Sequence, residues 1–341
     1  MSIDDTNIYN TFTKFFLFKS LLLLIIFMYF LLLFNNSKNN FNYEIKLYKK
    51  YIIICNRFKK YDNMEKTKNA NPYLSIILPV YNMEKYIERA LLSILHQSFQ
   101  DFEIILINDF SNDNTKQIIQ KYWKKEKRIR MIEHKQNLGV YISRVDGILN
   151  AKGQFILFID PDDILLNPCL FQKIFEINNK YNLDIIEFVV FYEKEGNNKI
   201  TIPNEHTLNH FHSFSEKIIY YPQLSNIIFF DHSNKNISGI ICRTIWNKII
   251  KKAILLKTIN FIGFDIDKFK NFNYAEDTIM NILNFQFANN YTNINVPGYL
   301  YNIRKKSISH KNSGPDYDIQ ISVNFLLYLT ILYKYKYINF I

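Results

Sequence analysis

Residues 155–163 read F-I-L-F-I-D-P-D-D, and this stretch decides how the chain folds. Five apolar residues in a row predict a short strand buried on both faces, because a strand with one solvated face would alternate with polar residues. Three carboxylates, those of Asp160, Asp162 and Asp163, follow the strand directly. Acids around a proline are also typical of a solvated turn, so the neighbouring segments decide between the two interpretations.

The chain upstream of this stretch alternates between strand and helix patterns. Short apolar runs predict strands at residues 74–78, 102–107 and 130–133. Between them apolar residues recur at helical spacing, and helices are expected around Ile87, Leu91, Ile94 and Leu95, around Ile118, Ile119 and Tyr122, and over residues 141–150. Together with the strand at 155–159, this order predicts an α/β fold with a mostly parallel, Rossmann-like sheet flanked by helices.

Polar residues stand where the expected strands end. They are Tyr81 and Asn82 after the first strand, Asp109 and Asp113 after the second, and Asp160, Asp162 and Asp163 after the fourth. Ligands of parallel sheets bind at the carboxyl ends of the strands, so one pocket is expected to collect these side chains. Clustered carboxylates repel one another unless a cation is bound, and oxygen ligands suit Mn²⁺ or Mg²⁺. We therefore predict a divalent metal at Asp160 and Asp162.

Several segments in this frame resemble the family 2 glycosyltransferases, enzymes of the GT-A fold that use nucleotide-sugar donors. The donor-binding half is matched by S-I-I-L-P-V-Y-N at 75–82, N-D-F-S-N-D-N-T at 108–115, N-L-G at 137–139 with Arg144, and F-I-D-P-D-D at 158–163. Fainter matches are W-N-K at 246–248, A-E-D-T at 275–278 and Y-N-I-R-K-K-S-I-S at 301–309. The chain is similar to the branch that adds single sugars, since it lacks the Q-x-x-R-W signature and the multiple membrane helices of processive synthases.

The resemblance implies a role in donor binding for five matching positions. The nucleoside would be held by Pro79, Tyr81, Glu84 and Asp109, with Tyr81 packing against the base and Asp109 accepting a hydrogen bond from it. Arg144 would lie beside the donor pocket. A purely structural explanation stays open for Tyr81, which could simply end a strand.

The resemblance assigns the chemistry to acidic residues. Asp160 and Asp162 would hold the metal and the diphosphate of the nucleotide, and Asp277 in A-E-D-T matches the catalytic base of the family. The alternative for Asp277 is that it caps the helix that follows it. The chain departs from the family pattern at Phe110, where a glycine is usual, and at Val145, where an asparagine often follows the arginine.

The implied reaction moves one hexosyl or N-acetylhexosaminyl group from a nucleotide sugar, expected to be a UDP-sugar, to a glycan or lipid-linked acceptor. A carboxylate would take the proton of the acceptor hydroxyl in a single in-line displacement that inverts the anomeric carbon. One alternative is a sugar-phosphate nucleotidyltransferase, although such enzymes carry a glycine-rich loop after the first strand and residues 79–83 contain no glycine. The other is a membrane-tethered glycan-binding or scaffold protein without catalytic activity.

Residues 15–34 are almost entirely apolar, and the run over 21–34 is unbroken. Crossing a bilayer takes ~20 apolar residues, and the absence of a polar face argues against a core helix, so an uncleaved transmembrane anchor is expected. Basic residues crowd its C-terminal flank. By the positive-inside rule, the sequence predicts a single-pass protein of an endomembrane or the plasma membrane, with the catalytic domain in the cytosol.

The other segments complete the expected organisation of the chain. They are an N-terminal tail at 1–14, a stem at 35–71, a GT-A domain at 72–310 made of a nucleotide-sugar half (72–165) and an acceptor half (166–310), and a C-terminal helix at 311–341. The formal net charge is +11, but the lysines are spread without an arginine-rich arm, so no nucleic-acid partner is expected. The three cysteines, odd in number and far apart, indicate neither a disulfide framework nor a zinc site.

Overall fold

The computed structural model describes residues 71–195, 200–201, 217–220, 244–262 and 276–304. Its strands are β1 (Leu74–Val80), β2 (Phe102–Asn108), β3 (Ile129–Glu133), β4 (Phe155–Phe158), β5 (Ile164–Leu165), β6 (Ile185–Lys194), β7 (Ile200–Thr201), β8 (Ile219–Tyr220), β9 (Lys248–Lys251) and β10 (Asn290–Ile303). Its helices are α3 (Ile87–Leu95), α4 (Thr115–Trp123), α5 (Val140–Asn150), α6 (Leu170–Tyr181), α10 (Lys252–Ile262) and α12 (Glu276–Phe287). The first seven elements alternate between strand and helix, as the sequence predicts.

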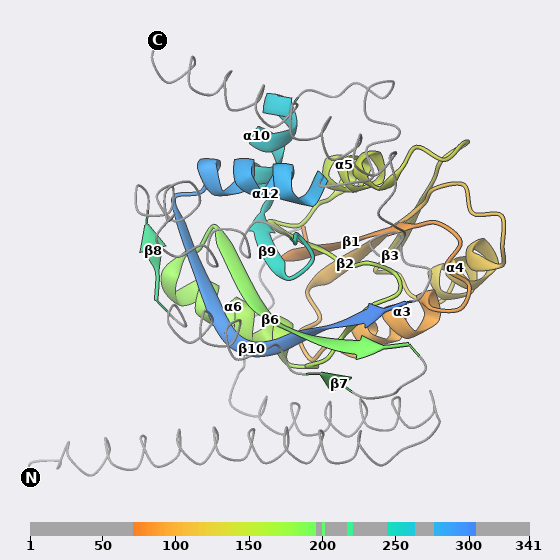
Figure 1. Cartoon of the computed structure of the whole chain (residues 1–341), viewed down its shortest axis with the longest axis horizontal. Coiled ribbons are helices and arrows are strands. Elements are labelled where there is room, and N and C mark those ends of the chain that lie inside the picture. Colours follow the sequence, from red (N-terminus) through yellow and green to blue (C-terminus); the bar gives the residue numbers. More distant parts are fainter. Residues whose placement is uncertain (1–70, 196–199, 202–216, 221–243, 263–275, 305–341) are drawn as a thin grey trace, which may run out of the picture.

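These strands form one sheet in the order β3-β2-β1-β4-β9-β6-β10-β5, with β7 beside β6 and β8 beside β10 (Figure 1). The four strands β3, β2, β1 and β4 are parallel to one another, and β10 is parallel to β6. Strand β9 lies between β4 and β6 and is antiparallel to both. The expected α/β fold is therefore confirmed, with antiparallel pairs added by the second half of the chain.

Strand β1 continues through Pro79 to Val80, past the end expected from the proline. The carbonyl of Ile77 accepts a hydrogen bond from the amide of Ile159 at 3.0 Å, so Ile77 faces the β4 side of the strand. Pro79, two residues further along, faces the same side, where β4 has already ended. The missing N–H of the proline leaves no ladder partner unsatisfied there, because β1 is paired only with β2 at this point.

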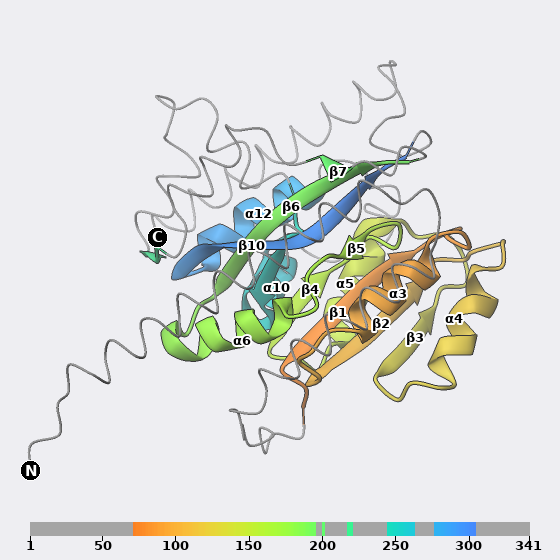
Figure 2. The same ribbon diagram turned by 90° about the horizontal axis from the view of Figure 1, so that it is seen from below.

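Helices cover both faces of the sheet and enclose two apolar cores. One core joins the sheet to α3, α4 and α6, and the other joins it to α5, α10 and α12. Figure 2 shows α3, α4 and α6 in front of the sheet, with α5, α10 and α12 behind it. Alternate residues of β1 serve the two cores, since Ile76 belongs to the first and Ile77 to the second. The central strands are therefore buried on both sides, which explains their continuous apolar sequence.

Four expected segments lie outside the described residues: the N-terminal tail at 1–14, the anchor at 15–34, the stem at 35–71 apart from its last residue, and the C-terminal helix at 311–341. Among the helices that are described, none is both long and apolar enough to cross a bilayer. The expectation for the cysteines was wrong in one respect, because Cys169, just before α6, takes part in a disulfide.

Candidate active site

The loops that follow β1 and β2 are joined by hydrogen bonds between backbone and side chains. The amide of Asn82 donates to Oγ of Ser111 at 3.1 Å, and the amide of Met83 donates to Oγ1 of Thr115 at 2.7 Å. The carboxylate of Glu84 accepts from both the amide and the side chain of Asn114, each at 3.0 Å. The two strand-end loops therefore form one rigid rim, and Glu84, expected to bind the nucleoside, also holds this rim together.

Two aromatic residues stand exposed on this rim. Tyr81 is 44% exposed and Phe110 is 53% exposed, although most large apolar side chains of the described residues are buried. Phe110 has a φ of 64°, a conformation that a bulky residue rarely adopts and that glycine adopts freely. The turn therefore keeps the geometry that a glycine would give it, and the departure from the family pattern adds an aromatic ring at its tip.

Asp109 is buried at the end of β2 and bound on both oxygens. It accepts from the amides of Leu138 and Gly139, each at 2.8 Å, and lies 2.7 Å from Nδ1 of His134. Nε2 of His134 lies 2.9 Å from Asp146. Burial lowers the pKa of His134, but its hydrogen bonds to the two carboxylates outweigh that effect and raise the pKa to about 9. The histidine is therefore protonated at neutral pH and donates to both acids, which gives Asp109 a structural function beside the expected contact with a base.

The D-P-D-D loop after β4 is fastened to β10 by its last acid. Asp163 accepts from the hydroxyl of Tyr299 at 2.8 Å and from the amide of Asn302 at 2.7 Å. The amide of Asp160 in turn donates to the same Tyr299 hydroxyl at 3.1 Å, and Trp246 stacks on the Tyr299 ring at 4.6 Å between centroids. Burial raises the pKa of Asp163 well above its ordinary value. Asp163 thus fixes the loop, while Asp160 pairs with Arg144 and Asp162 with Arg304.

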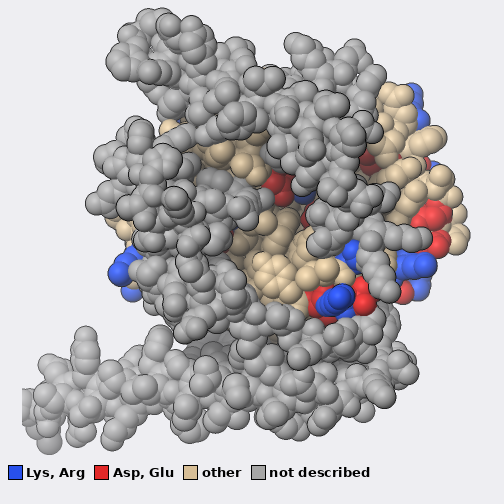
Figure 3. All heavy atoms as spheres, viewed as in Figure 1, with Lys and Arg blue, Asp and Glu red and all other residues tan. Residues whose placement is uncertain are grey.

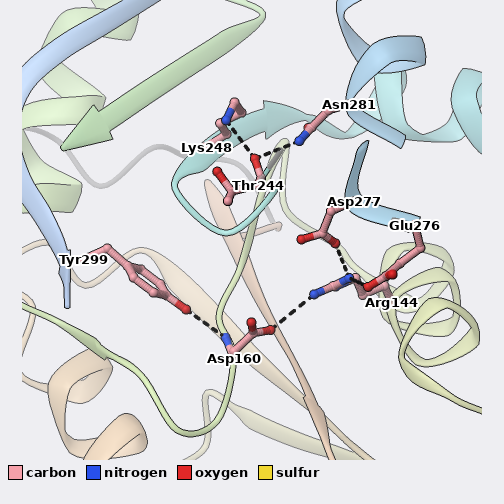
Figure 4. A network of polar contacts seen from close by, with 8 residues as sticks. All are labelled: Arg144, Asp160, Thr244, Lys248, Glu276, Asp277, Asn281 and Tyr299. Carbon is pink, nitrogen blue, oxygen red and sulfur yellow. Dashed lines mark hydrogen bonds and ion pairs between the residues drawn. The ribbon is translucent and has the colours of Figure 1, made fainter. Parts of the chain in front are cut away.

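Arg144, on α5, collects three carboxylates around one buried guanidinium (Figure 4). It lies 3.2 Å from Asp160, donates to Glu276 at 2.8 Å, and donates a further hydrogen bond to Asp277. Burial lowers the pKa of this arginine, but the three acids outweigh burial and raise it. The expected donor-pocket arginine and the expected base are therefore direct neighbours, although they come from opposite halves of the domain.

Asp277 is the second residue of α12, so it lies within the helix and not before it. Its side chain is 16% exposed, and its carboxylate accepts hydrogen bonds from Arg144 and from the amide of Ile245. Burial raises the pKa of Asp277 to about 7, against the opposing effect of Arg144 and with a further contribution from Glu276. A largely buried carboxylate that keeps some exposure and has a pKa near neutral pH has the properties of a general base.

The residues expected to bind a metal supply oxygen donors of the right kind. The side chain of Asp162 is 12% exposed and lies 2.5 Å from Nε of Arg304, while Asp160 is paired with Arg144. Burial, and then the charge of Asp160, raises the pKa of Asp162 to about 6. Two carboxylates that repel each other fit Mn²⁺ or Mg²⁺, which proteins often hold by one or two carboxylates and the phosphates of the substrate. Within the described residues no group of three Asp, Glu, His or Cys side chains is placed to form a complete site by itself.

The side chains that the sequence predicts at the strand ends thus lie at the carboxyl ends of the parallel strands. Figure 3 shows acidic and basic atoms side by side at the centre of one face, where α5 and α12 meet in Figure 1. His134 and Tyr299 were not expected in this cluster. His134 directly follows β3, so the strand-end reasoning that selected the acids would have found it. Tyr299 lies in the middle of β10, and nothing in the local sequence distinguishes it from a core residue.

Solved structures with the same arrangement of elements confirm the fold. The S. aureus protein TarS, residues 1–349 in complex with UDP-GlcNAc, superposes with a TM-score of 0.54 at 24% sequence identity. The match covers 71% of this chain and 61% of that one. At this level of identity the likeness establishes the fold alone.

The sheet topology and the acidic cluster at its strand ends define the class as an α/β protein of the GT-A type. The chain belongs to glycosyl transferase family 2, whose sequence pattern it matches over residues 75–248. This region begins in β1 and ends at the first residue of β9. It contains Asp109, Arg144 and the D-P-D-D loop, whereas Asp277 lies beyond it.

Two bacterial relatives represent the similarity in sequence. The chain is 29% identical over 247 residues to the uncharacterized glycosyltransferase EpsJ of Bacillus subtilis, a match that covers 72% of this chain and 66% of EpsJ. It is 35% identical over 127 residues to the GalNAc(5)-diNAcBac-PP-undecaprenol beta-1,3-glucosyltransferase of Campylobacter jejuni, which covers 37% of this chain and 40% of that enzyme. The chain therefore spans less than two thirds of either relative.

Proposed function

We propose that this protein transfers a single sugar from a nucleotide-sugar donor to an acceptor hydroxyl, with Asp277 as the general base. The observation that carries the proposal is the position of Asp277, whose partly exposed carboxylate lies in the strand-end cluster and has a pKa of about 7. Such a group is deprotonated often enough at neutral pH to accept a proton and is basic enough to hold it.

The arrangement of the side chains supports a proposed reaction in one step. Asp277 takes the proton of the acceptor hydroxyl while that oxygen attacks the anomeric carbon of the sugar, and the bond from this carbon to the nucleoside diphosphate breaks. An in-line displacement of this kind inverts the anomeric carbon. Arg144 orients Asp277 and keeps part of the cluster neutral through its ion pair with Asp160. A Mn²⁺ or Mg²⁺ ion held by Asp160 and Asp162 would neutralise the charge of the diphosphate.

The donor is proposed to be a UDP-sugar that carries a hexosyl or N-acetylhexosaminyl group. Pro79, Tyr81, Glu84 and Asp109 all lie at or shortly after the ends of β1 and β2, which supports a nucleoside site beside these two strand ends. The exposed ring of Tyr81 can pack against a base. Asp109 keeps the loops in shape through His134 and the two amides that it binds, so a contact with the base would use its remaining acceptor capacity.

The acceptor is proposed to be a glycan or a lipid-linked saccharide. The support comes from the Campylobacter jejuni relative, whose name describes a glucosyltransferase of an undecaprenol-linked glycan. The apolar run at 15–34 is proposed to anchor the chain in a membrane and so to keep the domain near a lipid-linked acceptor. The surplus of lysine and arginine behind this run supports a catalytic domain on the cytosolic side.

The substitution Asp277→Asn tests the proposal most directly. Asparagine keeps the size of the side chain but removes its basicity, so donor binding should persist while kcat falls by at least ~10²-fold. The amide oxygen of an asparagine can still accept a hydrogen bond from Arg144, so a purely structural function of Asp277 predicts nearly normal transfer in the same variant. Donor affinity and transfer rate should be measured together, with Glu276→Gln as the comparison. Retained transfer in Asp277→Asn would refute the assignment, and a loss only in Glu276→Gln would move the base to Glu276.

A further inference from the structure

One peptide unit connects the proposed base to a buried cation. The peptide between Thr244 and Ile245 uses its N–H to bind the carboxylate of Asp277. The carbonyl of the same peptide accepts from Nζ of Lys248 at 2.7 Å and from Nδ2 of Asn281 at 2.7 Å. Figure 4 shows dashed lines from Lys248 and Asn281, which lie on either side, meeting at Thr244, with Asp277 nearby. The two ends of this peptide therefore touch a cation and the base.

All three N–H groups of the Lys248 ammonium form hydrogen bonds within the core. Its side chain is 0% exposed, and its three N–H groups meet the Thr244 carbonyl, Oδ1 of Asn247 at 2.9 Å and Oε1 of Glu187 at 2.9 Å. Glu187 lies directly opposite Lys248 in the register of β6 and β9. Its carboxylate also accepts from Nδ2 of Asn247 at 2.9 Å and from the hydroxyl of Tyr291. The ammonium thus keeps a fixed position behind the peptide.

Other charged groups of the described residues also face Asp277. Arg144 on α5 stabilises its negative form, whereas Glu276 on α12 and Asp160 after β4 oppose it. The arginine divides its hydrogen bonds among these three acids. A second donor that is directed only at Asp277 would therefore decide which of the neighbouring carboxylates carries the charge.

We propose that Lys248 is a positioning residue for Asp277 and acts through the Thr244–Ile245 peptide. A hydrogen bond from a cation to the carbonyl polarises the peptide and strengthens its N–H as a donor, an effect of roughly 10–30% per bond. Asn281 adds a second bond to the same carbonyl. The peptide thereby orients the carboxylate of Asp277 and favours its ionised form, as a charged donor would, although the ammonium itself stays in the core. The consequence for catalysis rests on the proposed function of Asp277.

The test compares a charge-neutral double variant with a variant of the second donor. Lys248→Met together with Glu187→Gln removes the ammonium without leaving Glu187 buried and unpaired, which would destabilise the fold. Asn281→Leu leaves the ion pair intact and removes the second bond to the carbonyl. Lys251→Met is the matched control, because Lys251 lies in the same strand and forms an ion pair at 3.0 Å, with Asp184 as its partner.

The readout is the titration of Asp277 itself, followed by carbon-13 NMR on the full chain labelled at aspartate, with the resonance assigned by its loss in Asp277→Asn. The pKa of Asp277 should rise by roughly one unit in the double variant and by less in Asn281→Leu, because a bond to the charged form is weakened. The control should match the wild type. At acidic pH kcat should fall by about tenfold in the double variant, the fold-change that one pKa unit implies, and recover at alkaline pH while donor KM is unchanged.

The outcomes separate this inference from the proposed function. An unchanged titration of Asp277 in both variants overturns the coupling through the peptide, whatever the activity. A kcat that falls equally at all pH values also overturns it, because a general loss of structure would act in that way. Should the double variant not fold, Asn281→Leu decides alone by the same titration. A raised pKa combined with full transfer by Asp277→Asn would support the coupling and refute the proposed base.

Discussion

Arg144 donates a hydrogen bond to Asp277 although 133 positions separate them in the chain. The arginine comes from α5, in the first half of the domain, where strands and helices alternate as predicted. The acid comes from the start of α12, in the second half. The bond therefore joins the two halves of the sheet at the place where the reaction is proposed to occur. Because the guanidinium also pairs with Asp160, the donor side and the acceptor side share one cation.

The rate of transfer should rise with pH through about 7, because burial raises the pKa of Asp277 to about 7 and only the ionised form accepts a proton. Below this value kcat should increase about tenfold per pH unit, and above it kcat should level off. The measurement is kcat at saturating donor and acceptor across the pH range in which the protein stays folded. A flat profile in the wild type would contradict the assignment of Asp277.

Asp162→Asn should severely weaken nucleotide binding that depends on Mn²⁺ or Mg²⁺, because it removes one of two ligand charges from a loop outside the core. Titration calorimetry with UDP, with and without the metal, measures this effect. Glu126→Gln is the control. Glu126 also pairs with an arginine, at 2.9 Å, but it precedes β3 and so lies at the amino ends of the parallel strands, away from the proposed site. Equal metal dependence in wild type and Asp162→Asn would contradict the proposed metal site.

Phe110→Gly should stabilise the protein, because glycine adopts the φ of 64° without the steric penalty that a bulky residue pays there. The left-handed conformation disfavours a residue with a Cβ by roughly 1–2 kcal/mol, and the greater freedom of glycine in the unfolded chain offsets part of that, so a gain of roughly 0.5–1 kcal/mol is expected.

Denaturant unfolding measures this gain. Asn182→Gly provides the comparison, because Asn182 also has a positive φ, of 49°, but asparagine tolerates this region, so its gain should be smaller. Loss of stability in Phe110→Gly would show that the exposed ring makes contacts worth more than the strain.

Deletion of residues 1–36 should turn a membrane-bound protein into a largely soluble one that still binds donor, because the apolar run at 15–34 lies outside the sheet domain. Cell fractionation followed by nucleotide titration of the soluble chain checks both parts. A deleted chain that stays in the membrane fraction would contradict the proposed anchor and would direct attention to residues 311–341.

The sequence predicts the first half of the fold well, because each element there carries its own periodic signal. Strands β2, β3 and β4 and helix α5 match the expected ranges closely, and only β1 exceeds its range, at Pro79. The position of the acids could be predicted for the same reason, since a parallel sheet brings its strand ends together. Lys248 shows why other residues near the site could not be predicted. Its burial depends on Glu187, which comes from another strand of the sheet, and no local pattern reveals such a partner.

The insertion of β9 between β4 and β6 also bears on how the chain is made. A ribosome releases β4 and β6 long before β9, so both strands lack β9 as a neighbour while the intervening chain is being synthesised. Each then exposes an unpaired backbone edge that invites mispairing with other strands. We expect the nascent chain to need protection by chaperones until β9, and then β10 on the other side of β6, have left the exit tunnel, and truncations that end before β9 to aggregate.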